Sequence, residues 1–208
     1  MSNSKYHCRK ATQADSAEKI AQYLHLTDPY IYPFICKNAN DPSWISFIQH
    51  CMKTEGNLFH IDHLSVVLCN DEIVGVSCVI PCGKALSFLD SIEIPTPIQD
   101  SLRAVADGYF NPFLSDSMEL SGYNIANICI DENHRGQGIG SLFMTHCIET
   151  YGTHPIHLDT IASNEPAIRL YQKFGFQITK EYLGFSGNDS LLPCYHMLYT
   201  KNTENNLF

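Results

Sequence analysis

Arg135-Gly136-Gln137-Gly138-Ile139-Gly140 joins an apolar segment, residues 125–130, to an amphipathic one, residues 141–150. Three glycines at alternate positions allow the backbone to turn tightly and to approach a ligand closely. A helix that begins at the end of this turn points its free N–H groups back into the turn. The stretch is therefore predicted to bind an anion, and the usual anion at such a place is a phosphate or pyrophosphate.

Three phosphate-binding patterns compete for this loop. A Walker loop would end in Gly-Lys-Ser/Thr, but this loop ends in Gly140-Ser141 without a lysine. A dinucleotide fingerprint is matched only in its first half, and Asp159 is a weak candidate for its ribose-binding acid. The third pattern, Arg/Gln-x-x-Gly-x-Gly, is matched in full by Arg135, Gly138 and Gly140. A glycine turn that binds nothing is the remaining alternative.

A second pattern follows downstream. Residues 156–161 alternate between apolar and polar, as a half-buried strand does. Capping side chains and an early proline at 163–166 then begin a helix, which Gly175 ends. This segment reads Asn164-x-x-Ala167-x-x-x-Tyr171-x-x-x-Gly175-Phe176.

The two patterns occur in order, each within a strand–turn–helix unit, and together they resemble the GNAT N-acetyltransferase superfamily over residues 123–178. The resemblance implies an α/β fold of the GNAT acyl-CoA N-acyltransferase type. Such a fold has a central, mostly antiparallel mixed sheet that is splayed near its middle and flanked by helices. The resemblance also implies acetyl-CoA as the cofactor and direct transfer of its acetyl group to an amine in a ternary complex.

The resemblance places the coenzyme A pyrophosphate on the loop and the pantetheine arm along strand 123–130. The loop N–H groups would bind the pyrophosphate, and the strand would pair with the pantetheine amides. Asn164 matches a family position that hydrogen-bonds this arm, although plain helix capping also suits an asparagine there. The expected cofactor-binding residues are Ile128, Cys129, Ile130, Arg135, Gly136, Gln137, Gly138, Ile139, Gly140, Ser141, Asn164 and Ala167.

Tyr171 occupies the family's usual place for the general acid that protonates the leaving thiolate. A phenol, with a reference pKa near 10, stays protonated at working pH and can donate to the developing thiolate. An ordinary core tyrosine is the structural alternative. No motif identifies the base that deprotonates the amine. The candidates are a water chain or one of the acids Glu119, Asp131, Glu132, Glu93 and Asp28, and Glu119, which precedes the cofactor strand, is the first choice.

The acceptor site is expected in the first helices and in a long insertion at 83–121. Asp28, Tyr30 and Tyr32 combine a carboxylate with aromatic rings, a combination that can hold a cation. Rings that simply cover the core are an equal alternative. Glu93, within the insertion, is a candidate lid carboxylate.

Length and composition favour one domain over residues 1–208, with a frayed tail at 201–208. No apolar run reaches the roughly 18 residues of a membrane span, and the polar N-terminus lacks a signal core. Nine cysteines without a Cys-x-x-Cys pair predict free, buried thiols in a reducing compartment. A cytoplasmic protein without a membrane partner is therefore expected.

A formal net charge of −9 argues against nucleic acid as a partner and suits a cationic amine. The same charge disfavours acylation of aminoacyl-tRNA, while a non-catalytic acyl-CoA-binding domain of the same fold remains the main alternative. The pairs His60/His63 and His154/His157 lack thiols at zinc spacing, so they are interpreted as solvated or capping histidines rather than metal ligands. A homodimer is compatible with the sequence, which does not fix the oligomeric state.

The remaining periodicity predicts the other elements. We expect a strand at 6–11, a helix beginning at Thr12 or Asp15, and a proline-broken aromatic loop at 28–34. A helix is expected over Pro42–Cys51, and a hairpin with strands 64–69 and 73–80. Short strands at 176–178 and 194–199 complete the order.

Overall fold

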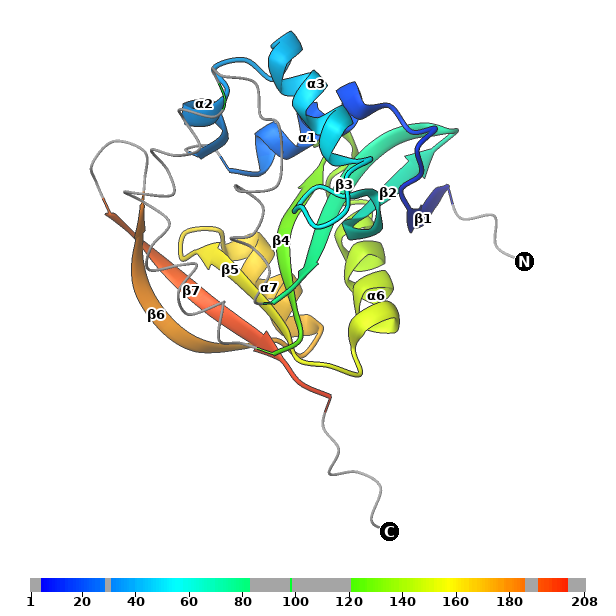
Figure 1. The fold of residues 1–208 in the computed structure, drawn as a ribbon. Coiled ribbons are helices and arrows are strands. Elements are labelled where there is room, and N and C mark those ends of the chain that lie inside the picture. The colour runs from blue at the N-terminus through cyan, green and yellow to red at the C-terminus, as the bar shows by residue number, and fades with distance from the viewer. Residues whose placement is uncertain (1–4, 29–30, 83–97, 99–120, 186–190, 202–208) are drawn as a thin grey trace.

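The structure is a computed structural model that describes residues 5–28, 31–82, 98, 121–185 and 191–201. Seven strands form one sheet in the order β1-β2-β3-β4-β5-β7-β6 (Figure 1). Of the pairs among these strands, β4–β5 is parallel and the others are antiparallel, which confirms the predicted mixed sheet. The strands are β1 Tyr6–Lys10, β2 Leu64–Cys69, β3 Glu72–Pro81, β4 Tyr123–Ile130, β5 Ile156–Ile161, β6 Gln177–Phe185 and β7 Leu191–Tyr199.

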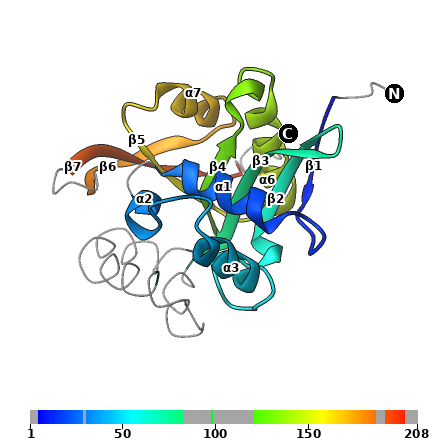
Figure 2. The same cartoon turned by 90° about the horizontal axis from the view of Figure 1, so that it is seen from above.

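The sheet separates two groups of helices (Figures 1 and 2). One group, α1 to α3, shares an apolar core with β2 and β3. The other group covers the opposite face, where α6 packs on β1, β3 and β4 and shares a core with α7, β5 and β7. None of the helices in the described ranges combines the length and apolar character needed to cross a membrane. The helices are α1 Ala17–Thr27, α2 Ile31–Ile35, α3 Pro42–Cys51, α6 Ile139–Tyr151 and α7 Glu165–Lys173, with 3₁₀ turns η1 Ile61–His63 and η2 Glu132–His134.

The splay predicted for the sheet lies between β4 and β5. Residues 123–125 pair with residues 156–158 and the pairing of β4 with β5 ends there, whereas β5 pairs with β7 along its whole length. Residues 126–130 of β4 and 159–161 of β5, the β4–β5 divergence, therefore have no strand-to-strand pairing with each other. The backbone on this side of β4 is left for another partner.

A β-bulge at Ala126 sets which way the side chains of β4 point. Val79 of β3 pairs with Ile125 and Cys78 with Asn127, so Ala126 is the extra residue. The bulge reverses the alternation, and Ile125 and Ile128 both pack with α6 and α7. Asn127 points the other way, where its Nδ2 donates to Thr27 Oγ1 at 2.8 Å.

Several element boundaries differ from the sequence expectation. Helix α1 begins later than predicted because Ser16 is its N-cap, accepting from the Lys19 N–H at 3.2 Å. Asp15 instead binds Arg9 through two hydrogen bonds of 2.7 Å. The aromatic loop expected at 28–34 contains the short helix α2. Strands β6 and β7 are longer than predicted, because they pair with each other from Gln177 to Phe185 and from Leu191 to Leu198, beyond the short segments that the sequence indicated.

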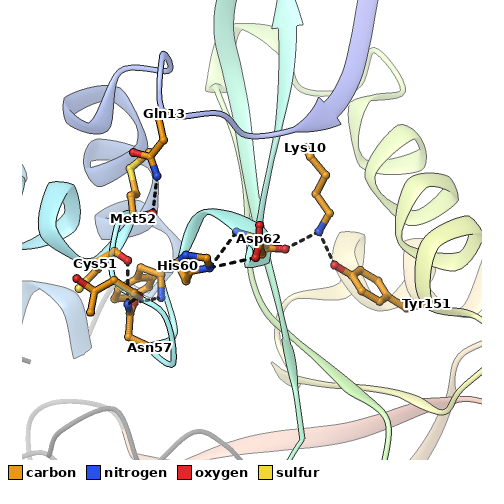
Figure 3. Close-up of polar contacts among 10 residues, drawn as sticks. Lys10, Gln13, Cys51, Met52, Asn57, His60, Asp62 and Tyr151 are labelled. Carbon is orange, nitrogen blue, oxygen red and sulfur yellow. Dashed lines mark hydrogen bonds and ion pairs between the residues drawn. The ribbon is translucent and has the colours of Figure 1, made fainter. Parts of the chain in front are cut away.

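The end of β1 is tied to both sides of the sheet (Figure 3). Lys10 Nζ donates to the Asp62 carbonyl at 2.8 Å and to the Tyr151 hydroxyl on α6. Burial lowers the pKa of Lys10, although nearby acids oppose this shift. Gln13, three residues on, donates to the Met52 carbonyl at 2.8 Å and so holds the chain after β1 against α3 (Figure 3).

The structure agrees with the prediction of free and mostly buried thiols. All nine cysteines are free, and seven of them are buried. Burial raises the pKa of Cys8 and Cys129 to about 11, so these thiols stay protonated at neutral pH.

Candidate active site

The glycine loop holds two left-handed residues. Gly136 has φ +72° and Gly138 has φ +87°, conformations that L side chains rarely adopt. A Cβ on either glycine would meet no protein atom within 4 Å. The two glycines are thus required by the path of the backbone, and the space beside them is open to a ligand.

Helix α6 begins directly behind the loop without a side-chain cap. Gly138 is its N-cap and makes no side-chain cap hydrogen bond, while the first intrahelical bond runs from Leu142 N to Gly138 O at 3.0 Å. The first-turn N–H groups have no acceptor within the helix. The positive end of the helix dipole therefore faces the loop, as an anion site requires.

Gly140 serves a different purpose from the other two glycines. A Cβ there would lie 2.8 Å from Leu170 Cδ2 of α7 and 3.6 Å from Ile130 Cδ1 of β4. This glycine allows the first turn of α6 to pack closely against α7. The sequence pattern groups Gly140 with the ligand loop, whereas the structure gives it a packing role.

The side chains of Arg135 and Gln137 form hydrogen bonds to other parts of the protein. Arg135 Nε donates to the Ile130 carbonyl at 3.2 Å, which closes the loop onto the end of β4. Gln137 Nε2 donates to the Asn133 carbonyl at 3.1 Å, and its Oε1 accepts from the buried Tyr6 hydroxyl at 2.6 Å. Because Tyr6 has one phenolic proton, its 3.0 Å contact with His134 requires the His134 Nδ1 to be protonated. No sequence pattern signals this contact, since Tyr6 lies far away in the chain.

Asp131, weighed in the sequence with other acids as a base, shapes the loop. Its carboxylate caps η2 through the Asn133 N–H at 2.9 Å and accepts from the Tyr23 hydroxyl at 3.0 Å. Burial by itself would raise the pKa of Asp131, but the hydrogen bonds from Asn133 and Tyr23 outweigh it and lower that pKa. A carboxylate so fully bonded is a weak proton acceptor.

Tyr171 lies on α7, packed against Phe176 with ring centroids 6.1 Å apart. Burial raises the pKa of Tyr171 to about 12. Among the described residues the Tyr171 hydroxyl has no hydrogen-bond partner, so this core tyrosine keeps its proton available.

Asn164 stands at the N-cap of α7 and is exposed, yet it makes no side-chain cap hydrogen bond. Its φ of −84° and ψ of 59° are not those of a capping residue. The capping interpretation of Asn164 is therefore wrong. Ser141 and Ala167, in the first turns of α6 and α7, are half-buried.

Only some of the residues predicted for the acceptor site lie within the described part of the chain. Tyr32 packs against Trp44 at 5.6 Å between centroids, and its hydroxyl lies 3.5 Å from Asn127 Oδ1 on β4. Burial raises the pKa of Tyr32. Asp28 ends α1 and is half-buried. Tyr30, Glu93 and Glu119 lie outside the described residues, as does most of the insertion.

A polar cluster that the sequence did not predict lies on β5, β6 and β7. His157 is 5% exposed, so its interpretation as a solvated or capping histidine is wrong. Its ring contacts His196, which contacts Asp159, and Tyr182 donates to the same carboxylate. The sequence signal that could have indicated this cluster is the i, i+2 spacing of His157 and Asp159 on a strand, because that spacing puts both side chains on one face of the sheet.

The profile of the Acetyltransferase (GNAT) family matches residues 26–176. The chain is 30% identical over 127 residues to a putative [ribosomal protein bS18]-alanine N-acetyltransferase of Bacillus subtilis (strain 168), covering 58% of this chain and 83% of that one. It is 42% identical over 62 residues to a spermine/spermidine N(1)-acetyltransferase of the same strain, covering 28% and 40%.

Solved structures agree in fold. An N-acetyltransferase from Staphylococcus aureus Mu50 superposes with a TM-score of 0.68 at 16% identity, covering 93% of this chain and all of the other. A putative acetyltransferase from Salmonella typhimurium, solved with its cofactor acetyl-CoA, superposes with a TM-score of 0.55 at 13% identity, covering 97% of each chain.

This chain belongs to the acetyltransferase (GNAT) family. It is a GNAT-type acyltransferase, and acetyl-CoA is its cosubstrate.

Proposed function

We propose that the protein transfers the acetyl group of acetyl-CoA to an amine of a small molecule or peptide in a ternary complex. The observation that carries this proposal is the open, uncapped turn before α6, combined with the Tyr171 hydroxyl on α7, which has no partner among the residues that the structure describes. The two relatives are named for acetylation of a protein alanine and of spermine or spermidine, which are both amines.

The pyrophosphate of coenzyme A would bind the backbone N–H groups of residues 136–141. Left-handed Gly136 and Gly138 and the dipole of α6 support this assignment. Gln137 and Arg135 would act through the loop, because their side chains already bind Tyr6 and the Ile130 carbonyl. Their contribution is to hold the N–H groups in a fixed arrangement before the cofactor arrives.

The pantetheine arm would pair with β4 in the β4–β5 divergence. The Asp131 N–H donates to Val74 O on β3 at 2.9 Å. Because alternate residues of a strand direct their backbone groups to opposite sides, Ile128 and Ile130 direct theirs toward the divergence. These groups can bind the pantetheine amides as a neighbouring strand would, and one N–H can polarise the acetyl oxygen. The uncommitted Asn164 side chain is a further candidate for the arm.

Tyr171 would protonate the leaving thiolate. Its pKa of about 12 keeps the phenol protonated at any physiological pH. A simple thiol has a pKa of about 8.5, and the phenol donates as negative charge builds on sulfur. Phe176 and the surrounding core fix the ring in place.

The acceptor amine would enter from the α1/α2 side, beside Asp28 and Tyr32. A carboxylate and aromatic ring suit an ammonium group, and the formal charge of −9 favours cationic substrates in general. We place the protein in the cytoplasm, on the grounds that nine free thiols suit a reducing compartment.

Thermal unfolding with and without acetyl-CoA tests the cofactor half of this proposal. A cosubstrate that binds the folded state raises the unfolding temperature. Thiol release is then followed against spermidine, an alanine-initiated peptide, single amino acids and an aminoglycoside. Amine-dependent thiol release identifies the acceptor class, whereas an unchanged unfolding temperature at millimolar acetyl-CoA would contradict the proposal.

A further inference from the structure

Asp159, His196 and His157 form a continuous hydrogen-bonded chain across β5 and β7. Asp159 and His196 are register partners, and His196 Nδ1 lies 3.1 Å from Asp159 Oδ1. His196 Nε2 lies 3.2 Å from His157 Nδ1, and His157 Nε2 lies 3.1 Å from the Ser121 carbonyl oxygen. Tyr182 on β6 donates to the same Asp159 Oδ1 at 3.0 Å.

The hydrogen bonds among Asp159, His196, His157 and the Ser121 carbonyl fix how many protons this hydrogen-bonded chain holds when every bond is made. The Ser121 carbonyl only accepts, so His157 Nε2 carries a proton, and an ionised Asp159 only accepts, so His196 Nδ1 carries another. The contact between the two rings needs a third proton. Two neutral imidazoles hold two protons, so the complete chain holds one more, which balances the charge of Asp159. The chain therefore gains and loses one proton as a unit.

The chain lies on the face of the sheet opposite to Tyr171. His157 and Asp159 alternate with Ile156 and Leu158, which pack in the core with α6 and α7. The histidine and the aspartate consequently point toward the side that carries α1 and α2 (Figure 2). Asp159 is also the first residue of β5 beyond the stretch that pairs with β4, which puts it at the β4–β5 divergence.

Two oxygens on this face lack a hydrogen-bond donor among the described residues. Asp159 Oδ1 accepts from His196 and Tyr182, but among the described residues Oδ2 has no partner. Asn124, the register partner of His157 on β4, has a buried Oδ1 that also lacks a partner within the described part of the chain. An ammonium group carries N–H donors for such acceptors.

The other titratable groups facing the chain are Tyr182, Cys194, Asp28 and Lys180, the last being the register partner of His196 on β6. Burial raises the pKa of Cys194, and the charges of Asp159 and Asp28 add to that shift, so both carboxylates lie near this thiol. Burial lowers the pKa of His157, although its Ser121 contact opposes the shift. The surroundings thus combine two acids with a ring that favours its neutral form.

We propose that Asp159 is the catalytic base for the acceptor amine, with His196 and His157 as positioning residues that hold the accepted proton. The inference rests on the proposed function. An N–H bond of the substrate ammonium breaks at Asp159 Oδ2, and its electron pair stays on nitrogen to attack the thioester carbonyl carbon. Before the reaction the two imidazoles carry their protons on His157 Nε2 and His196 Nε2, and the proton taken by Asp159 completes the hydrogen bond between Asp159 and His196 Nδ1. Tyr171 protonates the thiolate from the opposite face, and the second proton that the nitrogen loses as the amide forms restores the Tyr171 phenol.

The kinetic test compares Asp159→Asn and His196→Gln with His7→Gln, a matched control at an exposed histidine of β1. Acetyl transfer to spermidine and to an alanine-initiated peptide is measured across pH. Asp159→Asn should lower kcat about 100-fold or more with unchanged acetyl-CoA affinity by calorimetry. His196→Gln should move the acidic limb of the kcat profile toward lower pH, because the proton then has no imidazole to rest on and a carboxylate is a weaker base than an imidazole. His7→Gln should alter neither quantity.

Wild-type kcat in Asp159→Asn, or an unmoved acidic limb in His196→Gln, overturns the assignment. Nitrogen-15 NMR of the imidazole rings gives a readout that does not need turnover. The two histidines should titrate as one coupled step, and Asp159→Asn should separate them, whereas independent titration in the wild type contradicts the shared proton. A wild-type protein that neither binds acetyl-CoA nor acetylates either acceptor overturns the proposed function itself.

Discussion

The two faces of the β4–β5 divergence are built in opposite ways. On the α6/α7 face, the glycine turn, Asn164 and Tyr171 come from one continuous stretch of chain. On the α1/α2 face, Tyr32, Asn127, Asp159 and His196 come from four separate elements. A site built from one stretch leaves a pattern in the sequence, whereas a site assembled by sheet pairing leaves only scattered residues.

The largest effect on acetyl-CoA affinity is expected from Gly138→Glu, a substitution in the glycine turn of the α6/α7 face. The new side chain would fill the open space at the loop and repel the pyrophosphate, and φ +87° would add backbone strain. We expect acetyl-CoA affinity to fall by about 100-fold or more, equivalent to about 3 kcal/mol. Gly56→Glu is the matched control, since Gly56 has φ +83° and equally open surroundings. Calorimetry that gave equal losses for both variants would assign the effect to strain alone.

Tyr171→Phe should act on turnover rather than on binding. Loss of the phenol proton is expected to lower kcat by about 100-fold while acetyl-CoA affinity stays nearly constant. Because burial holds the Tyr171 pKa at about 12, the wild-type basic limb should show no loss of this acid below pH 10. Tyr199→Phe serves as control, since Tyr199 also packs on Phe176, at 5.5 Å. Parallel losses of kcat and affinity would indicate a purely structural Tyr171.

The Tyr6→Phe variant tests whether the glycine loop depends on a contact from β1, which is distant in the sequence. Removing the hydroxyl leaves Gln137 Oε1 and His134 Nδ1 without this partner. We expect acetyl-CoA affinity to fall about fivefold, in line with about 1 kcal/mol for one hydrogen bond. In calorimetry of Tyr6→Phe, Gln137→Ala and the double variant, the two losses should not add. Additive losses would mean that the two side chains act separately.

The smallest effect is expected from Asn164→Ala. Because Asn164 makes no cap hydrogen bond, the free energy of unfolding should change by less than about 0.5 kcal/mol. Ser16→Ala, which removes a cap that is made, should cost about 1 kcal/mol. Urea titration separates the two, and acetyl-CoA affinity should fall only in Asn164→Ala, by a few fold. A stability loss in Asn164→Ala equal to that in Ser16→Ala would restore the capping interpretation.

Sequence patterns predicted the elements that carry strong local signals. Strands β4 and β5 and helix α3 match their expected bounds, because apolar periodicity and a proline after a capping aspartate are local properties. The Tyr6–Gln137 contact and the Asp159–His196–His157 chain were missed, since both arise from strand register. The separate packing role of Gly140 was also hidden, because it depends on how close α7 comes to α6.

The bulge at Ala126 makes β4 tolerant of change at that position, in length as well as in composition. A substitution at exposed Ala126 leaves every later residue on its own side of the sheet. Deletion of the same residue would leave Ile125 and Asn127 adjacent, still paired with Val79 and Cys78 and still on opposite sides, so it would remove the bulge without moving any later side chain to the other face. Related chains should therefore vary freely both in which residue stands here and in whether a residue stands here at all.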